Sequence, residues 1–132
     1  MILVDSSVWA DFFNGYPSPE EIKLKTLLDT RADIAITGII ASEVLSGFKD
    51  EKTFEEVKDT FLQLPQTQIN LNSHILAAKM YRNLRSKGIT IRSIIDCLIA
   101  IIAIEDNLLL LHKDRDFEMI GKHYPSLKLL QV

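Results

Sequence analysis

The chain has 132 residues, 47% of them hydrophobic, a net charge of −3 and one cysteine, Cys97. This length predicts a single domain, residues 1–132, and one cysteine excludes an intrachain disulfide. The longest apolar run, residues 94–104, contains Asp96 and is too short to span a bilayer, and the N-terminus lacks a signal-peptide pattern. We therefore expect a cytoplasmic protein without a membrane segment.

The first half of the chain alternates short apolar runs with amphipathic segments. We predict a strand at 2–4, a helix from Ser6 or Ser7 to Asn14-Gly15, a helix over 22–28, a strand at 33–36, a helix from Thr37 to Gly47, and a helix around 54–62 closed by Pro65.

The second half continues the alternation with longer helices. We predict a strand at 68–71, a helix over 73–87 ended by Gly88, an almost wholly apolar helix capped by Ser93, a strand at 108–111, a helix over 117–123, and a strand at 127–130. This order predicts an α/β fold with three layers, in which helices cover both faces of a central parallel sheet of four to five short strands.

Four carboxylates fall where such a sheet places its binding site. Asp5 and Asp114 follow predicted strands, Glu43 lies in the second turn of the helix after the second strand, and Asp96 lies in the first turn of its helix. Ligands bind outside the carboxyl ends of parallel strands, so the four acids are expected to converge. Each also has a purely structural explanation, as a turn, a cap or an exposed helix residue.

Asp96 is the most informative of these acids because its helix is apolar almost all round. An ionised carboxylate in such surroundings requires a partner or a metal, or becomes neutral. The alternative is that Asp96 only complements the helix dipole. Clustered carboxylates without His or Cys ligands favour Mg²⁺ or Mn²⁺.

A basic stretch lies between Asp59 and Asp96, where the chain has no acidic residue. It contains Lys79, Arg82, Arg85, Lys87 and Arg92, and leaves ten basic and 18 acidic residues elsewhere. The spacing of Lys79, Arg82 and Arg85 places them on one helix face. This face, with Arg92, is predicted to bind an anionic substrate, although a merely solvated face is the alternative. Acid-held metal beside basic residues favours phosphodiester hydrolysis.

Three segments together resemble the PIN-domain ribonucleases, particularly VapC-type toxins of toxin–antitoxin pairs. They are MILVDSSVWADFF, ITGIIASEVLSGF and IIDCLIAIIAIEDNLLLLHKDRDF, in the family's order and over nearly the whole chain. The resemblance implies a PIN-like fold, RNA as substrate, a VapB-like antitoxin partner and a homodimer. It also implies that an apolar antitoxin segment covers part of the first two helices, whose apolar residues are Trp9, Phe12, Phe13, Ile22, Leu24, Leu27 and Leu28. The alternative is that all of these residues belong to the core.

Carried over by position, the resemblance assigns Asp5, Glu43, Asp96 and Asp114 as the catalytic quartet that holds Mg²⁺, with Mn²⁺ as a substitute. Asp116 matches a nearby acid that assists through contacts to these ligands, and Ser7 matches a small polar position beside the first acid. The chain departs from the family at His112, where Thr or Ser is usual.

Rival hypotheses make different demands on the sequence. A receiver-type signalling domain requires an acid pair after the first strand, and a haloacid-dehalogenase-like phosphatase requires an acid where Ser7 stands. The chain also has no Gly-rich phosphate loop. A catalytically silent RNA- or protein-binding module remains an alternative, as does a metal-free ribonuclease that uses His74, His112 or His123.

Overall fold

Four short parallel strands form the centre of the molecule in the computed structural model, which describes residues 1–132. They are β1 (Ile2–Val4), β2 (Ile34–Ala35), β3 (Leu109–Leu111) and β4 (Lys128–Leu129), in the spatial order β2-β1-β3-β4. Leu3 of β1 lies opposite Ala35 on one side and Leu110 on the other. A parallel sheet covered by helices explains why β1 and β3 are unbroken apolar runs.

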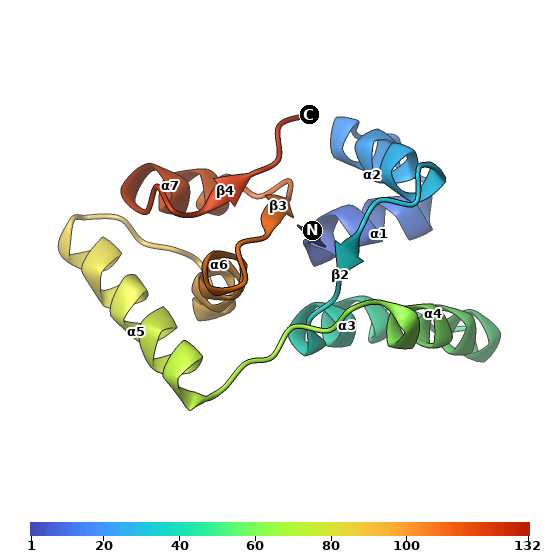
Figure 1. Cartoon of the computed structure of the whole chain (residues 1–132), viewed down its shortest axis with the longest axis horizontal. Helices are drawn as coiled ribbons and strands as arrows, with labels where there is room; N and C mark the ends of the chain where they lie inside the picture. The colour runs from blue at the N-terminus through green and yellow to red at the C-terminus, as the bar shows by residue number, and fades with distance from the viewer.

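Seven helices surround this sheet: α1 (Ser6–Asn14), α2 (Pro19–Asp29), α3 (Gly38–Leu45), α4 (Glu51–Gln63), α5 (Leu71–Ser86), α6 (Ile94–Glu105) and α7 (Arg115–His123). Figure 1 shows α1 and α2 on one side of the sheet and α5 and α6 on the other. The predicted three-layer α/β/α architecture is confirmed, with four strands where four to five were predicted.

One hydrophobic cluster of 29 buried residues joins the two sides of the sheet. Leu3 and Val4 of β1 and Leu110 and Leu111 of β3 are fully buried within it. Residues 97–103 of α6 are all buried, because this helix packs between the sheet and α5. The apolar character of α6 is therefore explained by its position in the core. None of the helices has the length and composition needed to cross a membrane.

The strand predicted at 68–71 is wrong. The only pairing near this segment is an isolated bridge between Ile36 and Gln66, and α5 already begins at Leu71. Asn70 ends the extended segment because its side chain accepts a hydrogen bond from the Ser73 backbone N–H at 3.1 Å and so caps the helix. The helix predicted at 73–87 therefore starts two residues earlier.

The apolar residues of α1 and α2 are mostly core. Trp9 and Leu24 are buried, and Phe12, Phe13 and Leu27 pack against the core. Only Ile22 and Leu28 expose a large apolar side chain, with 54% and 36% of their surface accessible. The apolar surface of α1 and α2 that a partner could contact is therefore smaller than the sequence indicated.

Candidate active site

Asp5 is held at the carboxyl end of β1 by the start of α1. It is the N-cap of this helix, and its Oδ2 accepts hydrogen bonds from the Ser7 hydroxyl at 2.6 Å and the Ser7 backbone N–H at 3.3 Å. The residue is 6% exposed, so these donors compensate part of the cost of burying its charge. Ser7 therefore lies where the sequence predicted it, beside the first acid.

Asp114 and Asp116 lie just after β3, and both accept hydrogen bonds from the Arg92 guanidinium. Asp114 caps α7 by accepting from the Asp116 backbone N–H at 2.9 Å. The Arg92 guanidinium donates to Asp114 Oδ1 at 2.6 Å and to Asp116 Oδ2 at 3.1 Å, and the Arg92 backbone N–H also donates to Asp116 at 3.2 Å. Asp116 is buried, whereas the Arg92 side chain is 67% exposed. Arg92 thus orients both acids from the rim of the site.

Burial and the negative charges of all the other acids of the site raise the pKa of Asp96. It is half-buried in the first turn of α6. Burial is the largest cause that raises the pKa of Asp96, which reaches about 7, and the negative charge of Asp114 is the next. The charges of Asp5, Asp116 and Glu43 act in the same direction. A pKa perturbed by burial and several neighbouring charges is typical of a functional site.

Glu43 faces the same site from α3. Burial, followed by the negative charge of Asp5, raises the pKa of the Glu43 carboxyl, and a hydrogen bond from Ser6 acts against this. Ser6 is a site residue that sequence analysis missed. Its only signal was its position beside Asp5 at the start of a helix.

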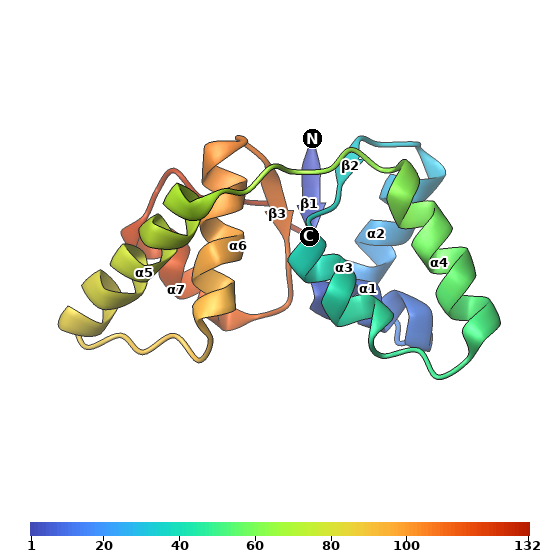
Figure 2. The same cartoon turned by 90° about the horizontal axis from the view of Figure 1, so that it is seen from below.

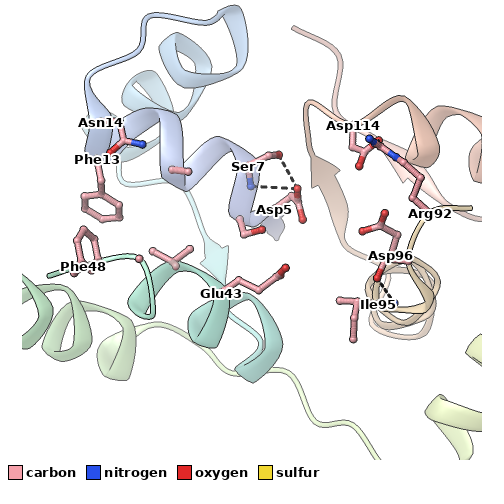
Figure 3. A pocket seen from close by; sticks show the side chains of 15 residues that line it. Asp5, Ser7, Phe13, Asn14, Glu43, Phe48, Arg92, Ile95, Asp96 and Asp114 are labelled. Atoms are coloured by element: carbon pink, nitrogen blue, oxygen red, sulfur yellow. Dashed lines mark hydrogen bonds and ion pairs between the residues drawn. The ribbon is translucent and has the colours of Figure 1, made fainter.

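All four predicted acids line one pocket of about 590 Å³. Figure 3 shows Asp5 and Glu43 on one side of it and Asp96, Asp114 and Arg92 on the other. The convergence predicted from the strand ends is therefore present in the fold, since β1, β3 and α6 all meet at this edge of the sheet (Figure 2).

The chemistry of these residues fits a divalent cation. One carboxylate oxygen from each of Asp96, Asp114 and Asp116 lies within 4.8 Å of the others, which is a group able to hold a metal ion. The donors are all hard oxygen ligands, as Mg²⁺ and Mn²⁺ require. A cation would also offset the repulsion that raises the pKa of Asp96. This compact group includes Asp116, for which the family resemblance implied only an assisting role, and does not include Asp5 or Glu43.

The predicted substrate-binding residues occupy two separate places. Lys79, Arg82 and Arg85 lie together on α5, where they line a surface hollow with Asn83 and Ser86. All three are exposed, and none forms an ion pair. Arg92 lines the acidic pocket instead. The basic residues therefore do not form a single patch.

None of the three histidines lines the acidic pocket. His112 is buried against Phe117, with ring centroids 5.2 Å apart, and its Nε2 lies 3.4 Å from Glu118. His74 and His123 contact backbone carbonyls within their own helices. This arrangement offers no histidine to a metal-free mechanism at the acids.

The fold and the acidic pocket agree with the sequence comparisons. The family model described as "PIN domain" matches residues 2–123. The chain belongs to the PIN-domain family. Among curated proteins, a VapC ribonuclease of Mycobacterium bovis and ribonuclease VapC11 of Mycobacterium tuberculosis are each 37% identical over 126 residues, which cover 92% of both chains.

Solved structures show the same fold. A chain of the crystal structure of VapBC2 from Rickettsia felis, bound to a DNA fragment from its promoter, has a TM-score of 0.72 and 25% identity, with 98% of each chain covered. VapBC-1 from nontypeable Haemophilus influenzae has a TM-score of 0.70 at 17% identity, covering 99% of this chain and 98% of that one.

Proposed function

We propose that the protein is a divalent-metal-dependent endoribonuclease and the toxin of a toxin–antitoxin pair, with Mg²⁺ as the cofactor and Mn²⁺ as a substitute. The observation that carries this proposal is the convergence of Asp5, Glu43, Asp96 and Asp114 on one pocket of a PIN domain. Relatives named as ribonucleases, 37% identical over 92% of the chain, support RNA as the substrate. The resemblance to VapBC2 supports an antitoxin partner.

The roles of the residues follow from their contacts. Asp96, Asp114 and Asp116 supply the compact oxygen group for the cation, while Asp5, fixed by Ser7, and Glu43 extend the ligand set across the pocket. A bound divalent cation supplies activation of a water molecule and neutralisation of charge on the phosphate.

Arg92 complements this group at the rim. Its guanidinium holds Asp114 and Asp116 in place and keeps an exposed surface toward the pocket, where N–H groups can contact a phosphate oxygen. Lys79, Arg82 and Arg85 add affinity for the rest of the RNA backbone, and such contacts carry no sequence preference.

Product analysis tests the mechanism. With Mg²⁺ or Mn²⁺ the protein should cleave bulk RNA and leave 5′-phosphate and 3′-hydroxyl ends, because water rather than the ribose 2′-hydroxyl attacks. EDTA should stop cleavage. Asp96→Asn should lower the rate by roughly 10²-fold or more, as expected when a charge-stabilising group is lost. Asp106→Asn, the same change at the exposed end of α6, is the matched control.

Two outcomes would contradict the proposal. Cyclic-phosphate ends that persist in EDTA would indicate a metal-free mechanism. No cleavage under any metal condition, together with RNA binding, would indicate the silent binding module.

We also propose a homodimer, which light scattering should detect as twice the 15.0 kDa mass of one chain.

A further inference from the structure

The acidic pocket extends well beyond the carboxylates and ends at two aromatic rings, Phe13 and Phe48. We propose that this aromatic end is a subsite for one nucleobase of the RNA, which stacks there while a neighbouring phosphate lies at the acids. Asn14, which also lines this end, would contact the edge of the base. The inference rests on the proposed ribonuclease function and specifies how that pocket holds its substrate.

Aromatic contacts hold the rings of Phe13 and Phe48 in place. Phe13 comes from the last turn of α1 and Phe48 from the segment after α3, and their centroids lie 5.2 Å apart with planes at 80°. The buried Trp9 stacks on Phe13 at 5.9 Å with planes at 16°. Phe13 and Phe48 remain half-buried, so both keep surface open to the pocket. Figure 3 shows them at the end of the pocket remote from Asp96 and Asp114.

The lining between the acids and the rings leaves room for a ribose-phosphate chain. Among the lining residues are Ala10 of α1, whose side chain is a methyl group, and Gly47 after α3, which has no side chain. An added Cβ at Gly47 would meet only the Val44 carbonyl oxygen, at 3.4 Å. The whole pocket, about 590 Å³, is within the size range of small-molecule sites.

The chemistry of the two ends matches the two parts of a nucleotide. A phosphate fits the acidic end, where a cation and the Arg92 guanidinium can neutralise its charge, whereas the aromatic end is uncharged and suits a flat base. Stacking of bases on aromatic side chains is the usual source of affinity for single-stranded RNA, and the Asn amide offers both a donor and an acceptor. We therefore expect the subsite to require an unpaired base.

Abasic substitution tests the subsite. A short single-stranded RNA that the wild-type protein cleaves is first selected from a random pool, and each base in turn is then replaced by an abasic residue. For the wild type, loss of one base near the cleaved bond should lower kcat/KM by about 5- to 150-fold, the value of one stacked base. Phe48→Leu should lower kcat/KM on the intact RNA by a similar factor and show little further loss when that base is removed.

Two variants serve as controls. Phe48→Tyr keeps the ring, so its abasic profile, the loss of kcat/KM on removal of each base in turn, should match that of the wild type. Phe54→Leu makes the same substitution at a half-buried phenylalanine outside the pocket, and should leave the profile unchanged. Thermal unfolding of each variant establishes that it is folded.

The outcomes separate this inference from the proposed function. An abasic profile of Phe48→Leu equal to that of the wild type would overturn the subsite while leaving the ribonuclease intact. The same profile combined with weaker antitoxin binding would assign the rings to the partner instead, and would also overturn it. A wild-type protein that cleaves no RNA in the pool would overturn the proposed function and this inference with it.

Discussion

Asp96 is the residue at which burial and negative charge combine most strongly. Its pKa of about 7 in the folded protein lies above the ordinary value of about 3.9 in the unfolded chain. The folded, metal-free protein therefore binds an additional proton between these two values. By linkage, the contribution of Asp96 to the free energy of unfolding falls as the pH rises from about 4 to about 7.

This linkage predicts the behaviour of Asp96→Asn in EDTA. The variant lacks the titrating group, so its stability should exceed that of the wild type at about pH 8 and approach it at about pH 5. Urea unfolding at the two pH values measures the difference, and Asp106→Asn should follow the wild type. Equal pH dependence in the wild type and Asp96→Asn would contradict the pKa assigned to Asp96.

Arg92 gives a second prediction at this scale. Arg92→Met leaves the buried Asp116 without its guanidinium partner, so the free energy of unfolding should fall. Arg115→Met, at an exposed arginine without an ion pair, should change stability little. Chemical unfolding near neutral pH compares the two variants. A loss no larger for Arg92 than for Arg115 would show that this ion pair is dispensable.

The sequence predicted the acids better than the groups that hold them. Asp5 and Asp114 were recognisable because Asp5 directly follows an apolar strand and Asp114 comes three residues after the end of another, and strand ends define the binding edge. The contacts of Arg92 join residues 22 and 24 positions apart, and the contact between Lys113 and Asp11 spans 102 positions. No local pattern encodes such pairs, because they depend on how the elements pack.

At the scale of elements, capping residues decided where the prediction succeeded. Ser93 begins α6 as its N-cap and Gly15 ends α1, both as expected, with Gly15 in the left-handed region at a φ of 70°. The alternation of polar and apolar residues at 68–71 predicted a strand, but Asn70 caps α5 within that segment. Two competing local signals overlapped there, and the tertiary packing of α5 against α6 favoured the helix.

The hollow on α5 carries the next prediction. Arg82→Glu with Arg85→Glu should weaken RNA binding at low salt and reduce the slope of log K against log[salt] by about 1–2, since two phosphate contacts are lost. Binding is best measured in the Asp96→Asn background, which prevents cleavage. Lys52→Glu with Lys122→Glu makes the same charge change at exposed residues elsewhere.

The two pairs of substitutions separate local contact from overall charge. A similar loss in both would mean that only net charge matters, and an unchanged slope in the Arg82 and Arg85 pair would establish a merely solvated helix face.

At the scale of the whole molecule, the sheet gathers residues from both ends of the chain at one edge. Asp5 and Asp114 are far apart in sequence but adjacent in the fold, because β1 and β3 are paired neighbours. A partner can therefore bind to the surface outside the pocket. On α2, the apolar side chain of Ile22 is 54% exposed and can contact such a partner.

Co-expression with the antitoxin proposed for this protein should therefore yield a stable complex, with a raised unfolding temperature because the partner binds only the folded state. Ile22→Glu should weaken the complex without affecting the fold of the free protein. Separate elution of the two wild-type proteins at micromolar concentration would remove the main support for the toxin–antitoxin assignment.

Asp5 and Asp114 each serve two purposes, since they line the pocket and cap α1 and α7. Asparagine caps a helix about as well as aspartate. A single-base mutation converts an aspartate codon to an asparagine codon, so, with the roles proposed for these acids, one mutation would yield an inactive protein that keeps its helix caps. In a lineage under pressure to silence such an activity, inactive alleles with intact structure should arise more readily than alleles encoding unfolded chains.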